Sequence, residues 1–343
     1  MTNTDERPRI RDLGVTPGVL PTGDDNALTD VPPVRVGHVS RSPERDDEST
    51  DVRTGVTAIH PHEGNVFERP VRAAAHVING HGKVVGLPQV REVGEIETPI
   101  ALTNTLNVWR VADALVDATL ESNPDALSIN PVVGECNDGA INDVQARHVT
   151  PEHVHAALDG ATESNREEGS VGAGVGMASF GWKSGIGTAS RRIDLGGATY
   201  TVGALVLSNT GEPGDLRIGG TPVGEALTPP TETARAGGSM VAVLATDAPL
   251  SVSQLERVAR RGEAGLGRTG AIAGHRTGDF VVAFSTAEAT TFDGDLRPAF
   301  RGAVEAVEES IYNSLVRATT VVGKEGATFT ALPLDDLRSL LDS

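Results

Sequence analysis

The chain has 343 residues, with 47 acidic against 29 basic side chains and a formal net charge of −18. Such an acidic surface argues against nucleic acid and anionic membranes as partners, because both are bound mainly through lysine and arginine. The single cysteine, Cys136, excludes an intrachain disulfide and any metal site built from clustered cysteines.

The basic residues are almost all arginine, since the only lysines are Lys83, Lys183 and Lys324. An acid-rich, lysine-poor chain indicates a halophilic source, because acidic side chains keep a protein hydrated in high salt. A GC-rich genome would explain the arginine preference but not the acid excess. There is no run of 18 apolar residues and no apolar segment near Met1, so we expect a cytoplasmic protein with neither a membrane span nor a secretory signal.

The first half of the chain mixes predicted strands and helices. After an exposed polar loop at residues 40–51, short apolar segments predict four strands, at residues 55–60, 73–79, 99–104 and 126–133. A polar loop at 134–143 follows the fourth strand. Helical spacing of apolar residues predicts a helix over 108–120, and a second helix begins at Pro151 and ends before Gly169.

The second half begins with a glycine-rich segment at residues 170–187, followed by a β-hairpin over 193–207 that turns at Gly196 and Gly197. The later predictions are a strand at 218–223, a surface loop at 228–238, a strand at 239–246, a helix at 253–267, a strand at 279–285 and a helix at 298–319. Strands followed by helices, twice and without regular βαβ alternation, predict a layered α+β fold.

The glycine-rich segment carries no nucleotide-binding motif. Gly172, Gly174 and Gly176 alternate with other residues but lack the spacing of a phosphate loop, so close backbone packing is the simpler interpretation. Lys183 lies among further glycines, where the backbone can approach a ligand, and we predict that it contacts substrate; the alternative is an ordinary surface lysine. The nine histidines form no pair at helical ligand spacing, so neither a metal nor a cofactor is expected.

Ser208 is a candidate nucleophile, because it directly follows the apolar residues 205–207 at the end of a predicted strand and begins a turn with Asn209. A serine at a strand end is common, and no histidine motif accompanies this one. Cleavage of the chain before Ser208 would free an α-amino group beside its hydroxyl. Such an amine has a pKa of about 8 and can act as a general base for its own side chain.

Segments along nearly the whole chain resemble the L-aminopeptidase/D-esterase family of self-processing N-terminal nucleophile hydrolases, which includes D-aminopeptidases and β-peptidyl aminopeptidases. The similar segments, in order, are RIRDLG at 9–14, NALTDVPPVRVGH at 26–38, NGHGKVVGL at 79–87, ETPIALTNT at 97–105, PVVGECNDG at 131–139, KSGIGTASR at 183–191, LVLSNTG at 205–211, ATDAPL at 245–250 and GLGRTG at 265–270.

The resemblance implies a four-layer αββα sandwich formed by one domain, residues 1–343, that cleaves itself between Leu207 and Ser208. The products would be an α chain of residues 1–207 and a β chain of residues 208–343. The mature protein would remove N-terminal residues from short peptides, amides or esters through an acyl-enzyme, without a cofactor, and would form a homo-oligomer of αβ units.

The resemblance also implies roles for individual residues around the nucleophile. They are Ser208 as nucleophile, Asn209 and Asn137 as oxyanion donors, Thr246 and Asp247 as a catalytic hydroxyl–acid pair with Ser239 as the alternative, and Ser239, Asn142 and Lys183 in substrate binding.

One departure from the family concerns the loop 135–143, where many relatives carry an aromatic residue and this chain has none. If a tyrosine hydroxyl normally stabilises the tetrahedral intermediate, this chain must use Asn137 or do without. Two alternatives therefore stay open. One is acyl transfer of the ornithine acetyltransferase kind, against which the serine at position 208 counts, because those enzymes use threonine. The other is a non-catalytic protein that kept the fold.

Overall fold

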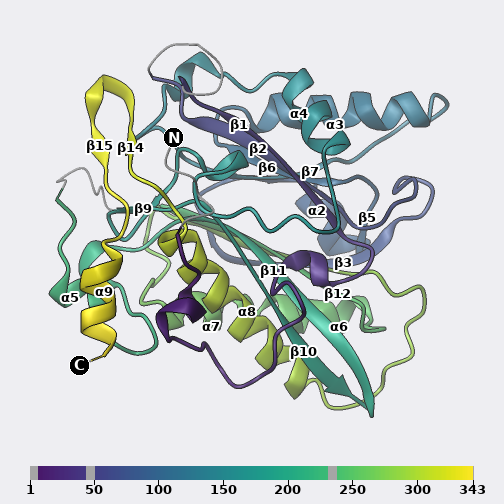
Figure 1. Ribbon diagram of the computed structural model, residues 1–343. Coiled ribbons are helices and arrows are strands. Elements are labelled where there is room, and N and C mark those ends of the chain that lie inside the picture. The colour runs from purple at the N-terminus through teal and green to yellow at the C-terminus, as the bar shows by residue number, and fades with distance from the viewer. Residues whose placement is uncertain (1–6, 44–50, 231–237, 343) are drawn as a thin grey trace.

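The computed structural model describes residues 7–43, 51–230 and 238–342. In this part of the chain two β-sheets face each other, and helices cover the outer face of each sheet (Figure 1). The four-layer αββα sandwich is therefore confirmed. Among the described helices, none combines the length and the apolar character needed to cross a bilayer.

The first sheet has five strands in the order β1-β2-β6-β7-β4. Their bounds are β1 Arg35–Arg41, β2 Thr54–His60, β6 Ile100–Asn104, β7 Val132–Cys136 and β4 Val84–Val85. Helices α3 (Val108–Ser122) and α4 (Pro151–Asp159) pack on its outer face, where Leu115 and Val154 join Ala58 of β2 in one apolar cluster. Strands β6 and β7 are parallel, so their carboxyl ends meet at one edge of the sheet.

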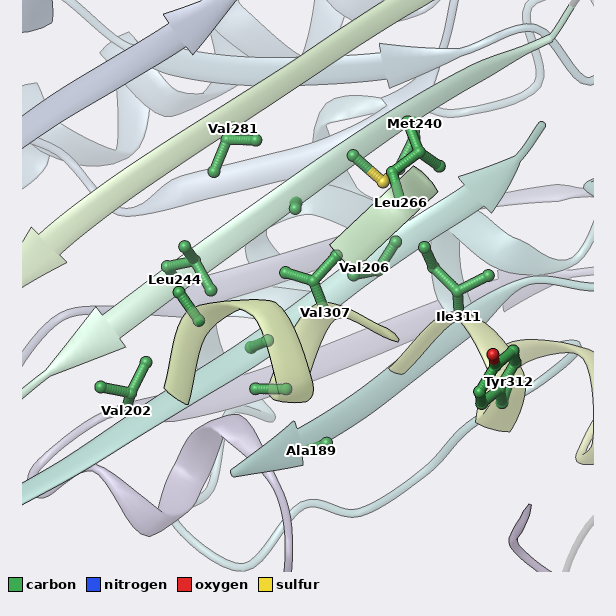
Figure 2. Close-up of a cluster of buried hydrophobic side chains, with 14 of the residues drawn as sticks. Ala189, Val202, Val206, Met240, Leu244, Leu266, Val281, Val307, Ile311 and Tyr312 are labelled. Atoms are coloured by element: carbon green, nitrogen blue, oxygen red, sulfur yellow. The ribbon is translucent and has the colours of Figure 1, made fainter. Parts of the chain in front are cut away.

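The second sheet has six strands in the order β10-β11-β12-β13-β3-β5. Their bounds are β10 Ile186–Leu195, β11 Ala198–Asn209, β12 Ser239–Thr246, β13 Gly278–Ser285, β3 Val71–Gly80 and β5 Glu95–Ile96. Helices α6 (Val252–Ala259), α7 (Arg261–Arg268) and α8 (Arg297–Val316) cover it. Figure 2 shows the apolar side chains between this sheet and its helices, with Met240 of β12 beside Leu266 of α7.

The remaining elements lie around the sandwich. They are α2 Leu87–Glu92, β8 Ala178–Ser179, β9 Trp182–Lys183, α5 Val223–Ala226, β14 Val321–Val322, β15 Thr328–Phe329 and α9 Leu334–Leu341. Strands β8 and β9 form a short antiparallel pair beside β11, and Lys183 of β9 also bridges to Ala331.

The two sheets approach closely where β7 lies over β12. Leu207 of β11 and Val241 of β12 point into the apolar layer between the sheets, together with Cys136 of β7. A Cβ added at Gly134 of β7 would lie 2.8 Å from Val241 Cγ1, so only glycine allows this approach. The close contact places the end of β7 directly against the ends of β11 and β12.

Several predicted elements are confirmed by the structure. The strand predicted at 239–246 is β12, and the hairpin formed by β10 and β11 turns at Gly196 and Gly197, which both have positive φ. The helices predicted over 108–120 and 298–319 correspond to α3 and α8. Most of the predicted surface loop at 228–238, residues 231–237, lies outside the described residues.

Four predicted elements differ from the structure. The helix predicted to run from Pro151 to before Gly169 is α4, which already ends at Asp159. The strand predicted at 126–133 begins only at Val132, and Leu127 is fully exposed at 102 % rather than buried. The strand predicted at 218–223 is a tight turn closed by a bridge from Ile218 to Thr221, because the two glycines between them adopt positive φ. The helix predicted at 253–267 is two helices, α6 and α7, separated at Arg260.

A buried ion-pair cluster fixes α8 to β10. Arg191 of β10 is fully buried, with its Nε 3.1 Å from Glu305 Oε2 and its Nη2 2.6 Å from Glu309 Oε2 on α8. Arg11, near the N-terminus, also pairs with Glu309 at 2.8 Å. The cluster ties the first residues of the chain to the helical layer behind the candidate nucleophile.

Candidate active site

Ser208 is the penultimate residue of β11 and is fully buried. It pairs with Met240 of β12, and its backbone N–H donates to the Gly185 carbonyl oxygen at 2.9 Å. Side chains alternate along a strand, and Val206 belongs to the cluster between the second sheet and its helices, so the Ser208 side chain lies on that helical side.

Two further serines surround Ser208 and had not been singled out in the sequence. Ser208 Oγ lies 2.9 Å from Ser179 Oγ of β8. Ser184, which follows β9, has its Oγ 2.8 Å from the Ser208 carbonyl oxygen and 2.9 Å from Ser179 Oγ. The Thr210 backbone N–H donates to Ser179 Oγ at 3.1 Å. Ser179 and Ser184 are both buried, so this hydroxyl cluster is shielded from water.

Two hydrogen bonds of the cluster have a fixed direction at Ser208 and Ser179. The Ser208 carbonyl oxygen can only accept, so the Ser184 hydroxyl donates to it, and the same hydroxyl also faces Ser179 Oγ as a donor. Ser179 Oγ accepts from the Thr210 N–H. Between Ser179 and Ser208 either hydroxyl can be the donor, so the Ser208 proton can point at Ser179 Oγ.

Lys183 lies beside this cluster but is not exposed to a ligand. Its side chain is fully buried, and its Nζ donates to the carbonyl oxygens of Gly174, at 3.1 Å, and of Ser184. Burial lowers the pKa of Lys183 to about 7, because no carboxylate compensates the ammonium. The structure therefore gives Lys183 a contact with the backbone that positions Ser184, rather than the predicted contact with substrate.

Asn209 and Asn137 lie next to each other beside Ser208. Asn209 Oδ1 accepts from the Ala178 N–H at 3.0 Å, and its Nδ2 donates to the Asn137 carbonyl oxygen at 3.1 Å. The Asn137 side chain is exposed, and its Oδ1 accepts from the Gly139 N–H at 2.9 Å. The Asn209 amide and the Asn137 amide oxygen thus make their contacts with loops around the nucleophile, not with the Leu207–Ser208 peptide bond.

Ser239, the alternative member of the predicted hydroxyl–acid pair, lies on the strand next to Ser208, and its catalytic role stays a prediction. It opens β12 and pairs with Asn209, one position from Ser208. The Cys136 Sγ lies 3.4 Å from the Ser239 carbonyl oxygen and 3.7 Å from the Leu207 carbonyl oxygen. Burial raises the pKa of Cys136 well above its ordinary value, so the thiol is protonated.

Thr246 and Asp247 lie at the opposite end of β12 from Ser208. Thr246 pairs with Val202, six residues before Ser208 on β11, which places it roughly 20 Å away at about 3.3 Å per residue. Thr246 Oγ1 donates to the Thr201 carbonyl oxygen at 2.7 Å, and Asp247 Oδ1 accepts from the Thr201 N–H at 2.7 Å. This correction removes both residues from the candidate site; they hold the strand end instead.

Asn142 is also placed differently from the prediction. It is fully buried, its Oδ1 accepts from the Arg53 N–H at 2.9 Å, and its Nδ2 donates to Asp138 Oδ2 at 3.1 Å. Asn104 donates to the same oxygen at 2.9 Å. Burial raises the pKa of Asp138 to about 6. These contacts make Asn142 part of the scaffold under the loop 137–142, not a substrate contact.

A cavity of about 290 Å³ lies beside this end of the second sheet. Thr210, two residues after Ser208, and Gly238, directly before Ser239, are in its wall, together with the carboxylate residues Glu212 and Asp215. Behind the wall, Thr277 Oγ1 donates to the buried Asp279, which lies in the same cross-strand row as Ser208 and Met240. Burial raises the pKa of Asp279 to about 6, and its Oδ1 has no partner among the described residues.

The site holds hydroxyls, a thiol and carboxylates, but no histidine takes part in the contacts described above. Over residues 7–43, 51–230 and 238–342, no group of three or more histidine, cysteine or acidic side chains could hold a metal ion. The arrangement offers a buried serine hydroxyl that is hydrogen-bonded to a second hydroxyl.

Comparison with known proteins gives consistent results over the whole chain. The sequence profile of Peptidase family S58 matches residues 26–329. Beta-peptidyl aminopeptidase BapA of Sphingosinicella microcystinivorans is 41 % identical, over 98 % of this chain and 92 % of its own length. The enzyme of the same name from Sphingosinicella xenopeptidilytica is 40 % identical, over 97 % of this chain and 91 % of its own.

Solved structures agree with the sequence comparison. A Pyrococcus horikoshii OT3 protein is 44 % identical with a TM-score of 0.91, over 98 % of this chain and 99 % of its own. The L-aminopeptidase D-Ala-esterase/amidase of Ochrobactrum anthropi, described as a prototype of the serine aminopeptidases and a variant of the Ntn hydrolase fold, is 36 % identical with a TM-score of 0.88, over 98 % of both chains.

Proposed function

Since the chain belongs to peptidase family S58, we propose that it is an aminopeptidase/amidase that matures by cleaving its own Leu207–Ser208 bond and then uses Ser208 as nucleophile. The observation that supports this most directly is the position of the Ser208 hydroxyl, 2.9 Å from Ser179 Oγ at the end of a buried strand. The BapA proteins and the Ochrobactrum enzyme, by their names, remove N-terminal residues or cleave amides.

Self-cleavage would begin with attack of Ser208 Oγ on the Leu207 carbonyl carbon. The Ser179 hydroxyl takes the Ser208 proton as it gives its own proton to the Ser208 nitrogen, so Ser179 stays a neutral hydroxyl. The C–N bond then breaks, which leaves an ester between Leu207 and Ser208 Oγ. Water then hydrolyses this ester, giving a Leu207 carboxylate, a free Ser208 hydroxyl and a new α-amino group. The hydrogen bond from the Ser184 hydroxyl to the Ser208 carbonyl oxygen, 2.8 Å, fixes the residue during these steps.

In the mature protein the same hydroxyl would attack a substrate carbonyl carbon. The new α-amino group accepts the hydroxyl proton and delivers it to the leaving amine or alcohol, and water then releases the acyl group from Ser208. No step requires a metal or an organic cofactor.

The substrate class we propose is short peptides, amides and esters with a free N-terminal ammonium group. The cavity beside Thr210 is bordered by Glu212 and Asp215 as well as by His275 and Arg276, and Asp279 lies behind it with an oxygen that has no partner among the described residues. The three carboxylates outnumber the one arginine, which favours a cation next to the nucleophile. Its volume, about 290 Å³, is at the small end for ligand pockets and suits one or two residues.

Release of p-nitroaniline from amino-acid p-nitroanilides tests this function. The wild-type chain should release it from substrates with a free amino group, and the same substrates acetylated on nitrogen should react at least about tenfold more slowly. Ornithine added as acceptor should not divert the acyl group, because the relatives described above are named as aminopeptidases. No release from any free-amine substrate by a cleaved chain would contradict the proposal.

Three further proposals concern the mature protein. The acid excess and scarcity of lysine favour a halophilic source, and the cytoplasmic location stays a prediction from the sequence. Resemblance to the family supports a homo-oligomer of αβ units. Light scattering of the purified protein in molar salt and in low salt would test both the oligomer and the salt requirement.

A further inference from the structure

The carbonyl oxygen of Leu207 collects negative charge during the proposed self-cleavage, and the atom placed next to it is a sulfur. Cys136 Sγ lies 3.7 Å from this oxygen and 3.4 Å from the Ser239 carbonyl oxygen. Both oxygens can only accept a hydrogen bond, so the thiol is the donor. The contact joins β7 of the first sheet to the scissile bond in the second.

We infer that the Cys136 thiol donates a hydrogen bond to the Leu207 carbonyl oxygen and stabilises the oxyanion that forms there when the chain cleaves itself. The inference rests on the proposed function, because the contact has a reacting atom only if the Leu207–Ser208 bond is cleaved. It assigns an oxyanion donor where the sequence had suggested Asn209 and Asn137, whose amide contacts are made elsewhere.

The thiol contact strengthens as the reaction proceeds. A thiol has one hydrogen, and in the uncleaved chain the Ser239 oxygen is the nearer of the two acceptors. When Ser208 Oγ bonds to the Leu207 carbonyl carbon, the carbonyl π electrons move onto the oxygen, which then becomes the stronger acceptor. An interaction that is gained mainly in the transition state lowers the barrier instead of stabilising the uncleaved chain.

The surroundings of Cys136 keep the thiol protonated and in place. The side chain is fully buried, and burial raises its pKa well above the ordinary value, so it remains a donor at any working pH and is a poor nucleophile. The close approach of Gly134 to Val241 fixes β7 against β12. The sulfur therefore cannot move away from the Leu207 oxygen without separating the sheets.

Two variants of matched shape test the inference, Cys136→Thr and Cys136→Val. Threonine keeps a hydroxyl donor, valine replaces it with a methyl group, and both suit a buried strand. The full-length chains are purified quickly, and the fraction cleaved at 207/208 is followed by intact mass. The Cys136→Thr chain should cleave itself at a rate within a few-fold of the wild-type rate. The Cys136→Val chain should cleave itself roughly tenfold to a hundredfold more slowly than wild type. Equal rates in the two variants, whether fast or slow, overturn the inference.

The wild-type chain is the control that distinguishes failure of this inference from failure of the proposed function. If the wild-type chain never cleaves at 207/208, both the inference and the proposed function are wrong. If the wild-type chain cleaves and the Cys136→Val chain cleaves as fast as the Cys136→Thr chain, only the role of Cys136 is wrong.

A second measurement does not depend on the Cys136 variants folding. Cys136 is the only cysteine, so the infrared S–H stretching band reports this thiol alone. The band should differ between the uncleaved Ser208→Ala chain and the mature wild-type protein, in which the Leu207 carbonyl has become a free carboxylate. An identical band in the two proteins overturns the inference.

Discussion

Lys183 offers a prediction whose size follows from its burial. The ammonium is fully buried and is bonded only to two backbone carbonyl oxygens, those of Gly174 and Ser184. Lys183→Met removes the charge and keeps the length of the side chain. The substitution is best made in a Ser208→Ala background, because a chain that cannot cleave unfolds as one molecule.

The folded-state pKa of Lys183 is lowered from 10.5 to about 7, so the unfolded chain binds more protons than the folded chain between these values. Stability therefore rises with pH over this range, and the cost of the buried charge is fully present below pH 7. At about 1.4 kcal/mol per pH unit for one proton, the gain between pH 7 and pH 9 is about 2 kcal/mol. The methionine variant leaves two carbonyl oxygens without this donor, which shifts its stability by an amount independent of pH.

Urea unfolding at several pH values between 7 and 9 measures this gain. Between pH 7 and pH 9, the free energy of unfolding should rise by about 2 kcal/mol more in the chain with Lys183 than in the Lys183→Met chain. Cys136 and all other titrating groups are common to both chains and cancel in the difference. Lys324→Met is the matched control and should keep the slope. Parallel stability curves for the lysine and Lys183→Met chains would refute a buried, uncompensated ammonium at position 183.

Four other substitutions separate the site from its surroundings. Ser179→Ala removes the hydroxyl that faces Ser208 and should slow self-cleavage about a hundredfold, measured by intact mass; an unchanged rate would exclude Ser179 as the proton acceptor. Thr246→Val and Asp247→Asn should leave the cleavage rate within twofold, because both residues lie roughly 20 Å away, and should cost only about 1 kcal/mol in urea unfolding. Arg191→Met removes the cation that the buried Glu305 and Glu309 share and leaves Glu309 with Arg11 as its remaining cation, so it should cost about 3 to 5 kcal/mol in the Ser208→Ala background; a loss below about 1 kcal/mol would show that the buried cluster contributes little.

The layers of the fold were predictable because they depend on local pattern. An unbroken apolar segment gave the bounds of β12, and two glycines fixed the turn between β10 and β11. The failed strand at 126–133 shows the limit of that reasoning. Its apolar side chains are too few to bury both faces, and Asn130 is instead held by Glu97 in an exposed turn.

Predicting where the site lies in the fold requires the register of the paired strands, and a single sequence does not contain that information. Ser239 and Thr246 open and close the same strand, and both carry a hydroxyl. Only the antiparallel pairing of Ser208 with Met240 decides that the first, not the second, lies at the nucleophile. Ser179 was not among the predicted site residues for a similar reason, because it is 29 residues before Ser208 and no periodicity relates the two.

The mass of the purified chain tests the central claim most directly. Expressed and purified in molar salt, the wild-type protein should give two masses, corresponding to residues 1–207 and 208–343, with serine as the first residue of the second. The Ser208→Ala chain should give one mass, that of all 343 residues. A wild-type chain that stays whole, or a Ser208→Ala chain that still divides at 207/208, would contradict self-cleavage by Ser208.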